Sequence, residues 1–411
     1  MATAGGSESW YIRPGARRWE CAAPDPAASA FHADLPGYRP TRLIELPALA
    51  EELHVSRVFV KDESARLGLP AFKVLGASWG VARVLAGSSS PAAAGDAETG
   101  DVVPGDAGAG NAVAGDAGAS DAPGGLTVAG LRRVAAARPV ELVTATDGNH
   151  GRAVAWMGRL LGLKARVFVP KVVPAEASAA IAGEGATVTA VDGPYDRAVE
   201  LAADYAAAGQ GRALVQDMGW PGYERVPGWI VEGYGTLLRE VDTQLAERGV
   251  PGPGLVSVPV GVGSLAQAVV AHYRSRPARR GGSPPAVLSV EPDTAACLLA
   301  SLLDGATRSV HTADTVMAGL NCGTPSSLAW PVLAAGLDAA IAVPDRAAVR
   351  AAADMARLGV QAGPCGAASL AGVRAALTGP DAGDRRDGLA VTPSSVVVLL
   401  STEGRRTAAT A

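Results

Sequence analysis

Lys73 has the sequence features of a chemically active amine. It follows Phe72 and precedes Val74, so we expect its ammonium group to lie in an apolar setting. Burial disfavours the charged form of a lysine and lowers its pKa, which leaves a neutral amine that can form a Schiff base. Nearly all other basic residues are arginines, which favours a special role for this lysine. Only four lysines occur among the 36 Lys and Arg residues, and they are Lys61, Lys73, Lys164 and Lys171.

A glycine-rich loop, "PVGVGSL" at 259–265, follows a predicted strand and opens a predicted helix. Gly261 and Gly263 allow backbone N–H groups to approach an anion at the helix N-terminus. The loop matches the dinucleotide fingerprint G-x-G-x-x-A, for which Glu291, at the end of the next predicted strand, would bind the ribose. It could equally hold a single phosphate group. A phosphate site combined with a Schiff-base lysine is typical of pyridoxal phosphate.

Two aspartates follow separate predicted strands, Asp147 in "TDGNHG" and Asp217 in "QDMGW". Carboxylates on opposite faces of a planar, electron-withdrawing group could remove the α-proton from either enantiomer of an amino acid. The alternative for each aspartate is a helix N-cap or a turn residue without a chemical role.

Strands and helices alternate along most of the chain, which predicts an α/β fold with a mainly parallel sheet. In such sheets ligands bind at the carboxyl ends of the strands, where these polar motifs lie. The predicted strands include 57–63, 164–170, 186–193, 212–217 and 286–292. The predicted helices include 152–162, 174–185 and 195–209.

The composition excludes several classes of protein. A net charge of −4 over 411 residues gives no basic surface for nucleic acid. No apolar run is long enough to span a membrane, and the first residues lack an apolar signal core. Four cysteines without a C-x-x-C pair and five scattered histidines indicate a reduced, cytoplasmic protein with no metal site. Residues 86–125 contain almost only small and acidic residues, so we expect a disordered insert there.

Several longer segments resemble one family. The segments "KDES-RLGLPAFKVLGAS", "TDGNHGRAVAW", "VQDMGWPGYERVPGWIVEGYGTL", "EPDTAACLLAS", "TVMAGLNCGTP" and "VLLSTEG" are similar to segments of diaminopropionate ammonia-lyases. These are fold-type II pyridoxal-phosphate enzymes, in the superfamily of tryptophan synthase β and threonine dehydratase. The resemblance covers roughly 9–85 and 126–404. It implies two three-layer α/β domains with mainly parallel sheets: a large cofactor-binding domain of 1–75 and 191–411, and a small domain of 76–190 that contains the insert.

The resemblance also implies roles for individual residues. Lys73 would bind pyridoxal 5′-phosphate covalently, Asn149 would bind its phenolic oxygen, and Ser401, with Thr402 as an alternative, would face the pyridine nitrogen. The phosphate would lie on Gly261, Val262, Gly263, Ser264 and Leu265. The substrate α-carboxylate would lie near Thr146, Gly148 and His150, beside Asp147. The family also implies a homodimer.

The implied reaction is α,β-elimination of 2,3-diaminopropionate to pyruvate and two ammonia. Asp217 would take the α-proton of the L form and Asp147 that of the D form. A second ammonium on the substrate favours a carboxylate at Asp147, which serine or threonine would leave buried and unpaired. Alternatives are a serine/threonine dehydratase or β-replacement enzyme of the same fold, a dinucleotide-binding protein, and an inactive homologue.

Two local features remain outside this scheme. The sequence has Gly363-Pro364-Cys365-Gly366 where the family tends to have Gly-Glu-Ser-Gly, so a glutamate is missing near the cofactor ring. Cys297 and Cys322 follow separate strand ends, and the sequence leaves open whether they form a redox-sensitive disulfide. Buried free thiols are the common case in a cytoplasmic protein.

Overall fold

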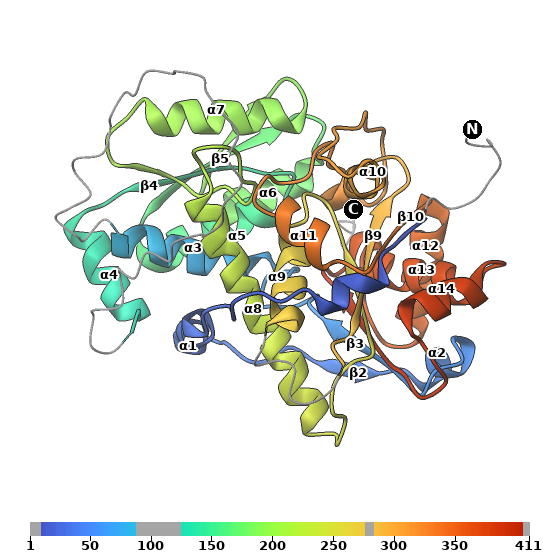
Figure 1. Cartoon of the computed structure of the whole chain (residues 1–411). Helices are drawn as coiled ribbons and strands as arrows, with labels where there is room; N and C mark the ends of the chain where they lie inside the picture. Colours follow the sequence, from blue (N-terminus) through green and yellow to red (C-terminus); the bar gives the residue numbers. More distant parts are fainter. Residues whose placement is uncertain (1–9, 88–124, 276–282, 406–411) are drawn as a thin grey trace, which may run out of the picture.

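The computed structural model describes residues 10–87, 125–275 and 283–405, and its helices and strands form two α/β units (Figure 1). Both sheets are mainly parallel, as the alternation of strands and helices predicts. The larger sheet has the strand order β1 (Trp10–Ile12), β10 (Ala339–Val343), β9 (Ala286–Pro292), β8 (Leu255–Pro259), β11 (Val396–Ser401), β3 (Arg57–Asp62) and β2 (Leu43–Glu45). Only its two edge strands, β1 and β2, pair antiparallel.

The smaller sheet is entirely parallel. Its strand order is β6 (Thr187–Val191), β5 (Lys164–Pro170), β4 (Glu141–Ala145) and β7 (Arg212–Leu214). The helices are α1 (Ala27–Asp34), α2 (Pro47–Glu52), α3 (Lys73–Gly87), α4 (Val128–Ala137), α5 (Asn149–Leu161), α6 (Ala175–Gly183), α7 (Tyr195–Ala207), α8 (Arg225–Ala246), α9 (Ser264–Arg274), α10 (Cys297–Asp304), α11 (Trp330–Gly336), α12 (Asp345–Arg357), α13 (Pro364–Thr378) and α14 (Ala382–Leu389).

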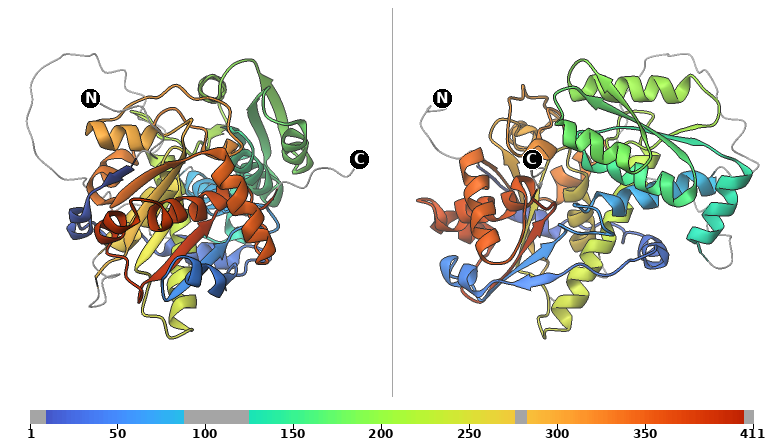
Figure 2. Two further views of the ribbon diagram at one scale, coloured as in Figure 1. Left: turned by 90° about the vertical axis from the view of Figure 1, so that its right-hand side faces the viewer. Right: turned by 180° about the vertical axis from the view of Figure 1, so that it is seen from behind.

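Each sheet is covered by helices on both faces. Successive residues of β11 point to opposite faces, so Val397 and Leu399 pack in one apolar cluster and Val398 and Leu400 in another. The first cluster includes residues of α12 and α13, and the second includes residues of α8 and α9. Figure 1 and the rear view in Figure 2 show the smaller unit and the helices α12–α14 on opposite sides of the molecule. Two three-layer units are therefore present, as the resemblance implies.

The boundary between the two units lies further along the chain than we expected. The predicted boundary at residue 190 falls inside β6, and it assigns β7 to the large domain although β7 pairs with β4 of the smaller sheet. Sequence periodicity predicts strands but not the sheet to which each belongs. We therefore propose that the small unit continues through Leu214.

The segment predicted as an insert is only partly within the described structure. Residues 88–124 lie outside the described residues, whereas Ala86 and Gly87 form the last turn of α3. The helix therefore extends two residues into the range assigned to the insert.

The loop between β3 and α3 is fixed by a buried ionic cluster. The Arg66 guanidinium donates to both carboxylate oxygens of Glu63 and both of Glu240, at 2.6–2.8 Å. The Lys61 ammonium lies 2.6 Å from Glu240 and donates to the Thr41 carbonyl. Because Glu240 is on α8, the cluster anchors the loop that ends at Lys73 to the longest helix. Lys61 therefore has a structural role.

Within the described residues, no helix is long and apolar enough to cross a membrane. The same part of the chain contains no group of three or more His, Cys, Asp or Glu side chains arranged to hold a metal ion.

Candidate active site

Lys73 and Asp217 form the centre of the candidate site. Lys73 is the first residue of α3, and its Nζ donates to Asp217 Oδ2 over 2.6 Å. Asp217 follows β7 and its side chain is 7% exposed, whereas the Lys73 side chain is 24% exposed. The carboxyl ends of strands from both sheets thus contribute to one polar cluster.

The ionisation of this pair differs from the sequence-based expectation. Burial alone would lower the pKa of Lys73, but the adjacent Asp217 carboxylate outweighs it, and the pKa is raised. The expected neutral amine is therefore wrong for this arrangement. Burial likewise opposes ionisation of Asp217, but the charge that His150 carries when protonated in acid and the charge of Lys73 lower the pKa of Asp217 to about 2. The pair consists of an ammonium and a carboxylate.

Asp147 lies in the same electrostatic environment. It follows β4, and burial raises its pKa to about 6, with Lys73 opposing this rise and Asp217 adding to it. Its carboxyl group therefore titrates close to neutral pH, whereas Asp217 stays ionised. Two carboxyl groups with different proton affinities are suited to different steps or substrates.

His150 lies between the two loops that carry these acids. Its Nε2 bonds the Val215 carbonyl at 2.8 Å, which makes Nε2 the protonated nitrogen of a neutral ring. Burial lowers the pKa of His150, which favours that neutral form. Nδ1 lies 3.8 Å from Asp217 Oδ2 and has no hydrogen-bond partner among the described residues. It is therefore an acceptor available to a bound group.

Thr146 and Gly148 form the turn that starts α5. The Thr146 hydroxyl accepts hydrogen bonds from the Gly148 and Gly151 N–H groups, at 2.9 and 3.1 Å. This arrangement closes the first turn of the helix. The Gly148 N–H is thus already used within the loop, so it is not an open donor for a carboxylate.

Asn149 points toward a residue to which the sequence had assigned no role. It is the first residue of α5, and its Nδ2 donates to Glu403 Oε2 over 2.8 Å. Glu403 is 6% exposed and follows β11 after Ser401 and Thr402. Its side chain also lies beside Gly363, since a Cβ built on that glycine would be 3.0 Å from Glu403 Oε1.

The glycine-rich loop forms a cradle at the start of α9. Gly263 has φ +99°, which favours glycine, and it precedes the first helical residue, Ser264. A Cβ on Gly261 would lie 3.0 Å from Cys322 Sγ, so this loop packs closely on the segment around Cys322. The Ser264 hydroxyl donates to the backbone carbonyl of Asp217 over 3.0 Å, which links the glycine-rich loop to the segment that carries this acid. Val262 and Leu265 complete the predicted loop.

Cys297 and Cys322, whose pairing the sequence leaves open, are both free thiols. They lie on either side of Gly261: Cys297 Sγ is 3.8 Å from the Gly261 carbonyl, and Cys322 Sγ faces its Cα. The two thiols are neighbours, and their free state agrees with the common case for cysteines in a cytoplasmic protein. Burial raises the pKa of both thiols, which disfavours the reactive thiolate.

Three site residues were missed in the sequence: Glu403, Tyr195 and Tyr234. Tyr195 accepts a hydrogen bond from Gln216 Nε2 at 2.7 Å, and burial followed by the charges of Asp217 and Asp147 raises its pKa. The Tyr234 ring packs on Phe72, with ring centroids 4.8 Å apart. Glu403 and Tyr234 both lie in segments that resemble the family, whereas Tyr195 has no local signal.

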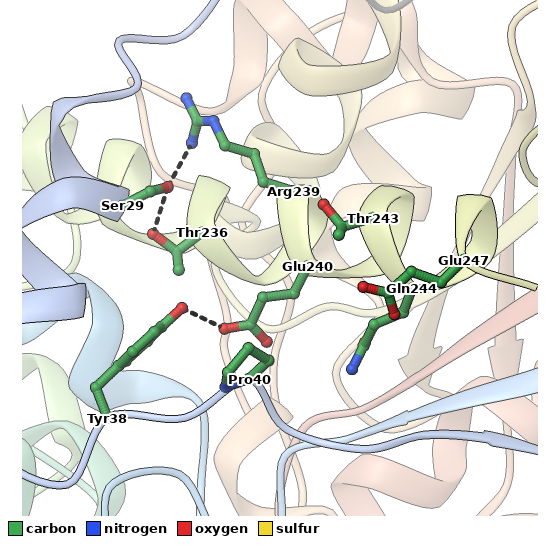
Figure 3. Close-up of a pocket in the computed structure, with 9 residues that line it drawn as sticks. All are labelled: Ser29, Tyr38, Pro40, Thr236, Arg239, Glu240, Thr243, Gln244 and Glu247. Atoms are coloured by element: carbon green, nitrogen blue, oxygen red, sulfur yellow. Dashed lines mark hydrogen bonds between the residues drawn. The ribbon is translucent and has the colours of Figure 1, made fainter.

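A separate pocket lies between the N-terminal segment and α8 (Figure 3). It has a volume of about 240 Å³, and Tyr38 donates to Glu240 at its base. Its lining residues are Ser29, Tyr38, Pro40, Thr236, Arg239, Glu240, Thr243, Gln244 and Glu247. None of them is a predicted site residue, so this pocket is distinct from the cluster around Lys73.

Comparison with known proteins assigns the family. The family model described as "Pyridoxal-phosphate dependent enzyme" matches residues 125–401. The diaminopropionate ammonia-lyase of Salmonella typhimurium is 34% identical over 390 residues, which cover 91% of this chain and 87% of that protein. The Escherichia coli enzyme of the same name is 34% identical over 92% of this chain and 87% of its own.

The chain belongs to the diaminopropionate ammonia-lyase family.

A crystal structure of the E. coli diaminopropionate ammonia-lyase in complex with D-serine has the same fold. It superposes with a TM-score of 0.77 at 30% identity, covering 97% of this chain and 94% of that chain. The predicted family, fold-type II architecture and cofactor are thereby confirmed, and the dinucleotide-binding alternative is excluded.

The residues of this diaminopropionate ammonia-lyase family member fit pyridoxal phosphate. Ser401 Oγ is buried and has no hydrogen-bond partner among the described residues. This hydroxyl is therefore free to bond the pyridine nitrogen of the cofactor. The N-terminus of α9, with Gly261 and Gly263 in front of it, suits a phosphate group. Lys73 and Asn149 lie in the same site.

Proposed function

We propose that the protein catalyses the α,β-elimination of 2,3-diaminopropionate to pyruvate and two ammonia. The observation that carries this proposal is the grouping of two carboxylates around Lys73: its Nζ donates to Asp217 over 2.6 Å, and its charge acts on Asp147. Glu403 adds a third negative charge that also acts on Asp147. A site with excess negative charge favours a substrate with two ammonium groups. Serine carries only one, so it would leave a carboxylate without a cationic partner.

The chain's own residues suit the proton transfers. Pyridoxal phosphate, when bound, supplies the electron-withdrawing ring that stabilises the electron pair left at the α-carbon. Asp217 is ionised and largely buried, and it accepts the α-proton of the L enantiomer in this proposal. Asp147 accepts that of the D enantiomer and interacts with the β-ammonium of both. His150 Nδ1 offers a further acceptor for an N–H group of the substrate.

The remaining contacts are assigned by the same proposal. Lys73 holds the cofactor, Ser401 faces its ring nitrogen, and the phosphate binds at residues 261–265. Thr146 keeps the turn before α5 in shape, so that Asp147 and Asn149 face the site.

We also propose that the protein is a cytoplasmic homodimer. The free thiols of Cys297 and Cys322 support a reducing compartment. Light scattering of the purified protein gives the mass of the assembly directly, and a monomeric mass would contradict the dimer.

A substrate panel tests the proposed reaction. Pyruvate release is measured from L- and D-2,3-diaminopropionate, L- and D-serine, and L-threonine, with ammonia counted in parallel. We expect diaminopropionate to have the highest kcat/KM and to yield two ammonia per pyruvate. Preference for serine or threonine, with one ammonia per oxoacid, would assign the protein as a dehydratase.

A further inference from the structure

Glu403 and Asn149 form a contact between the two α/β units. The proton transfers proposed above give this contact no role. Asn149 starts α5, which follows β4 of the smaller sheet, and Glu403 follows the interior strand β11 of the larger sheet. Asn149 Nδ2 donates to Glu403 Oε2 over 2.8 Å. Glu403 is 6% exposed, so water has little access to this bond.

The Glu403 backbone is hydrogen-bonded to the start of α13, and its side chain lies beside the same segment. Its carbonyl accepts a hydrogen bond from the Gly363 N–H at 3.0 Å. A Cβ on Gly363 would lie 3.0 Å from Glu403 Oε1, and one on Gly366 would lie 2.8 Å from the Glu403 carbonyl oxygen. The glycines therefore let the glutamate approach the start of α13 closely.

An ionised carboxylate can only accept hydrogen bonds. Asn149 has an amide nitrogen that donates and an oxygen that accepts, and the two ends differ little in size. A neutral partner that can both accept and donate a hydrogen bond would allow either orientation of the Asn149 amide. Glu403 selects the orientation in which Nδ2 faces the carboxylate, which also fixes the directions of the second N–H and of Oδ1.

We propose that Glu403 is a positioning residue that fixes the Asn149 amide so that its second N–H is presented to the phenolic oxygen of pyridoxal phosphate. The proposal rests on cofactor binding by this family and on the assignment of Asn149, and it is independent of which amino acid is the substrate. It also gives a role to the one buried carboxylate of the site that the proposed proton transfers do not use.

The Glu403→Gln variant separates orientation from shape. Glutamine has nearly the same size, but its amide can donate to Asn149 Oδ1, which allows the Asn149 amide to reverse. An oxygen would then face the phenolic oxygen, and a favourable contact becomes a repulsive one. Glu403→Asp keeps the negative charge and should retain part of the preference for one orientation of the Asn149 amide. Glu184→Gln is the matched control, since Glu184 is 7% exposed but bonds Arg152 and Arg159 on the surface of the smaller unit.

A double-mutant cycle on cofactor binding tests the proposal. The dissociation constant of pyridoxal phosphate is measured by fluorescence, and the visible spectrum of the bound cofactor is recorded, without substrate. Loss of one hydrogen bond should weaken binding by about tenfold. We expect such a loss in Glu403→Gln and in Asn149→Ala, and no further loss in the double variant.

The spectrum provides a readout that a purely structural role would not change. Glu403→Gln and Asn149→Ala should share one altered ratio of the cofactor absorbance bands, and Glu403→Asp should lie nearer the wild type. Glu184→Gln should match the wild type in both measurements. The proposal is wrong if the two losses multiply in the double variant, or if Glu403→Gln keeps the wild-type affinity and spectrum. Thermal unfolding of each variant identifies any that fails to fold, and the comparison then uses Glu403→Asp.

Discussion

The ammonium group of Lys73 and the carboxylate of Asp217, which are 144 positions apart in the chain, share a 2.6 Å hydrogen bond. The bond joins the loop after β7 of the smaller sheet to the start of α3. It raises the pKa of Lys73 and contributes to the low pKa of Asp217. The acid that we propose as the proton acceptor is therefore already in contact with the amine that we propose to hold the cofactor.

Lys73 should be the lysine that binds pyridoxal phosphate. The purified protein should be yellow, and borohydride reduction should fix the cofactor on the peptide that contains Lys73. Mass spectrometry of the digest identifies the labelled residue, and Lys73→Ala serves as the unlabelled control. A label on Lys61, Lys164 or Lys171 would contradict the assignment.

The preference for the two enantiomers should change with pH. The Asp147 pKa of about 6 means that its carboxylate forms as the pH rises through that value, whereas Asp217, with a pKa of about 2, stays ionised. Both enantiomers present the same β-ammonium, so the ratio of their kcat/KM values isolates the role of the base. We expect the D to L ratio to rise through about pH 6. A ratio that stays constant from pH 4.5 to 8 would show that Asp147 is not the base for the D form.

Much of this arrangement could be predicted from the sequence. The strand ranges 164–170 and 286–292 coincide with β5 and β9, because short runs of apolar, β-branched residues lie between turn residues. The rule that ligands bind at strand ends correctly brings Lys73, Asp147 and Asp217 into one region.

The errors arise where long-range contacts decide the outcome. The pKa of Lys73 was predicted from its apolar neighbours in sequence, but Asp217, distant in sequence, reverses the direction. The assignment of β7 to a sheet depends on which strand it pairs with, which periodicity does not reveal. Glu403 was visible within "STEG", yet its meaning depends on its contact with Asn149.

Arg66 should be required for stability. It is fully buried, and its removal leaves the carboxylates of Glu63 and Glu240 buried with fewer cationic partners. Loss of one partner of a buried ion pair typically costs about 3–5 kcal/mol. Arg66→Met should therefore lower the free energy of unfolding, measured with urea, by about that amount. Arg57→Met is the control, because the Arg57–Glu45 pair is exposed and should change stability little. Equal stability of both variants would contradict a structural role for the cluster.

Asp217 and Asp147 should each act as the base for a different enantiomer of 2,3-diaminopropionate. Asp217→Asn should retain the cofactor and bind L-2,3-diaminopropionate, yet lose about 10²–10⁴ in kcat, which is the usual cost of removing a general base. Asp147→Asn should reduce turnover of the D enantiomer more than that of the L enantiomer, and raise KM for both because the β-ammonium loses a carboxylate.

Asparagine keeps the shape of each side chain and removes only its charge, so the comparison tests proton transfer rather than packing. In Asp217→Asn the pKa of Lys73 should also fall, because burial then acts without the carboxylate that opposes it. Turnover of each enantiomer and of L-serine is measured for the wild type and both variants. If both variants keep wild-type turnover of both enantiomers, neither carboxylate is the base. The proton would then go to the Lys73 amine, the remaining basic group at the centre of the site.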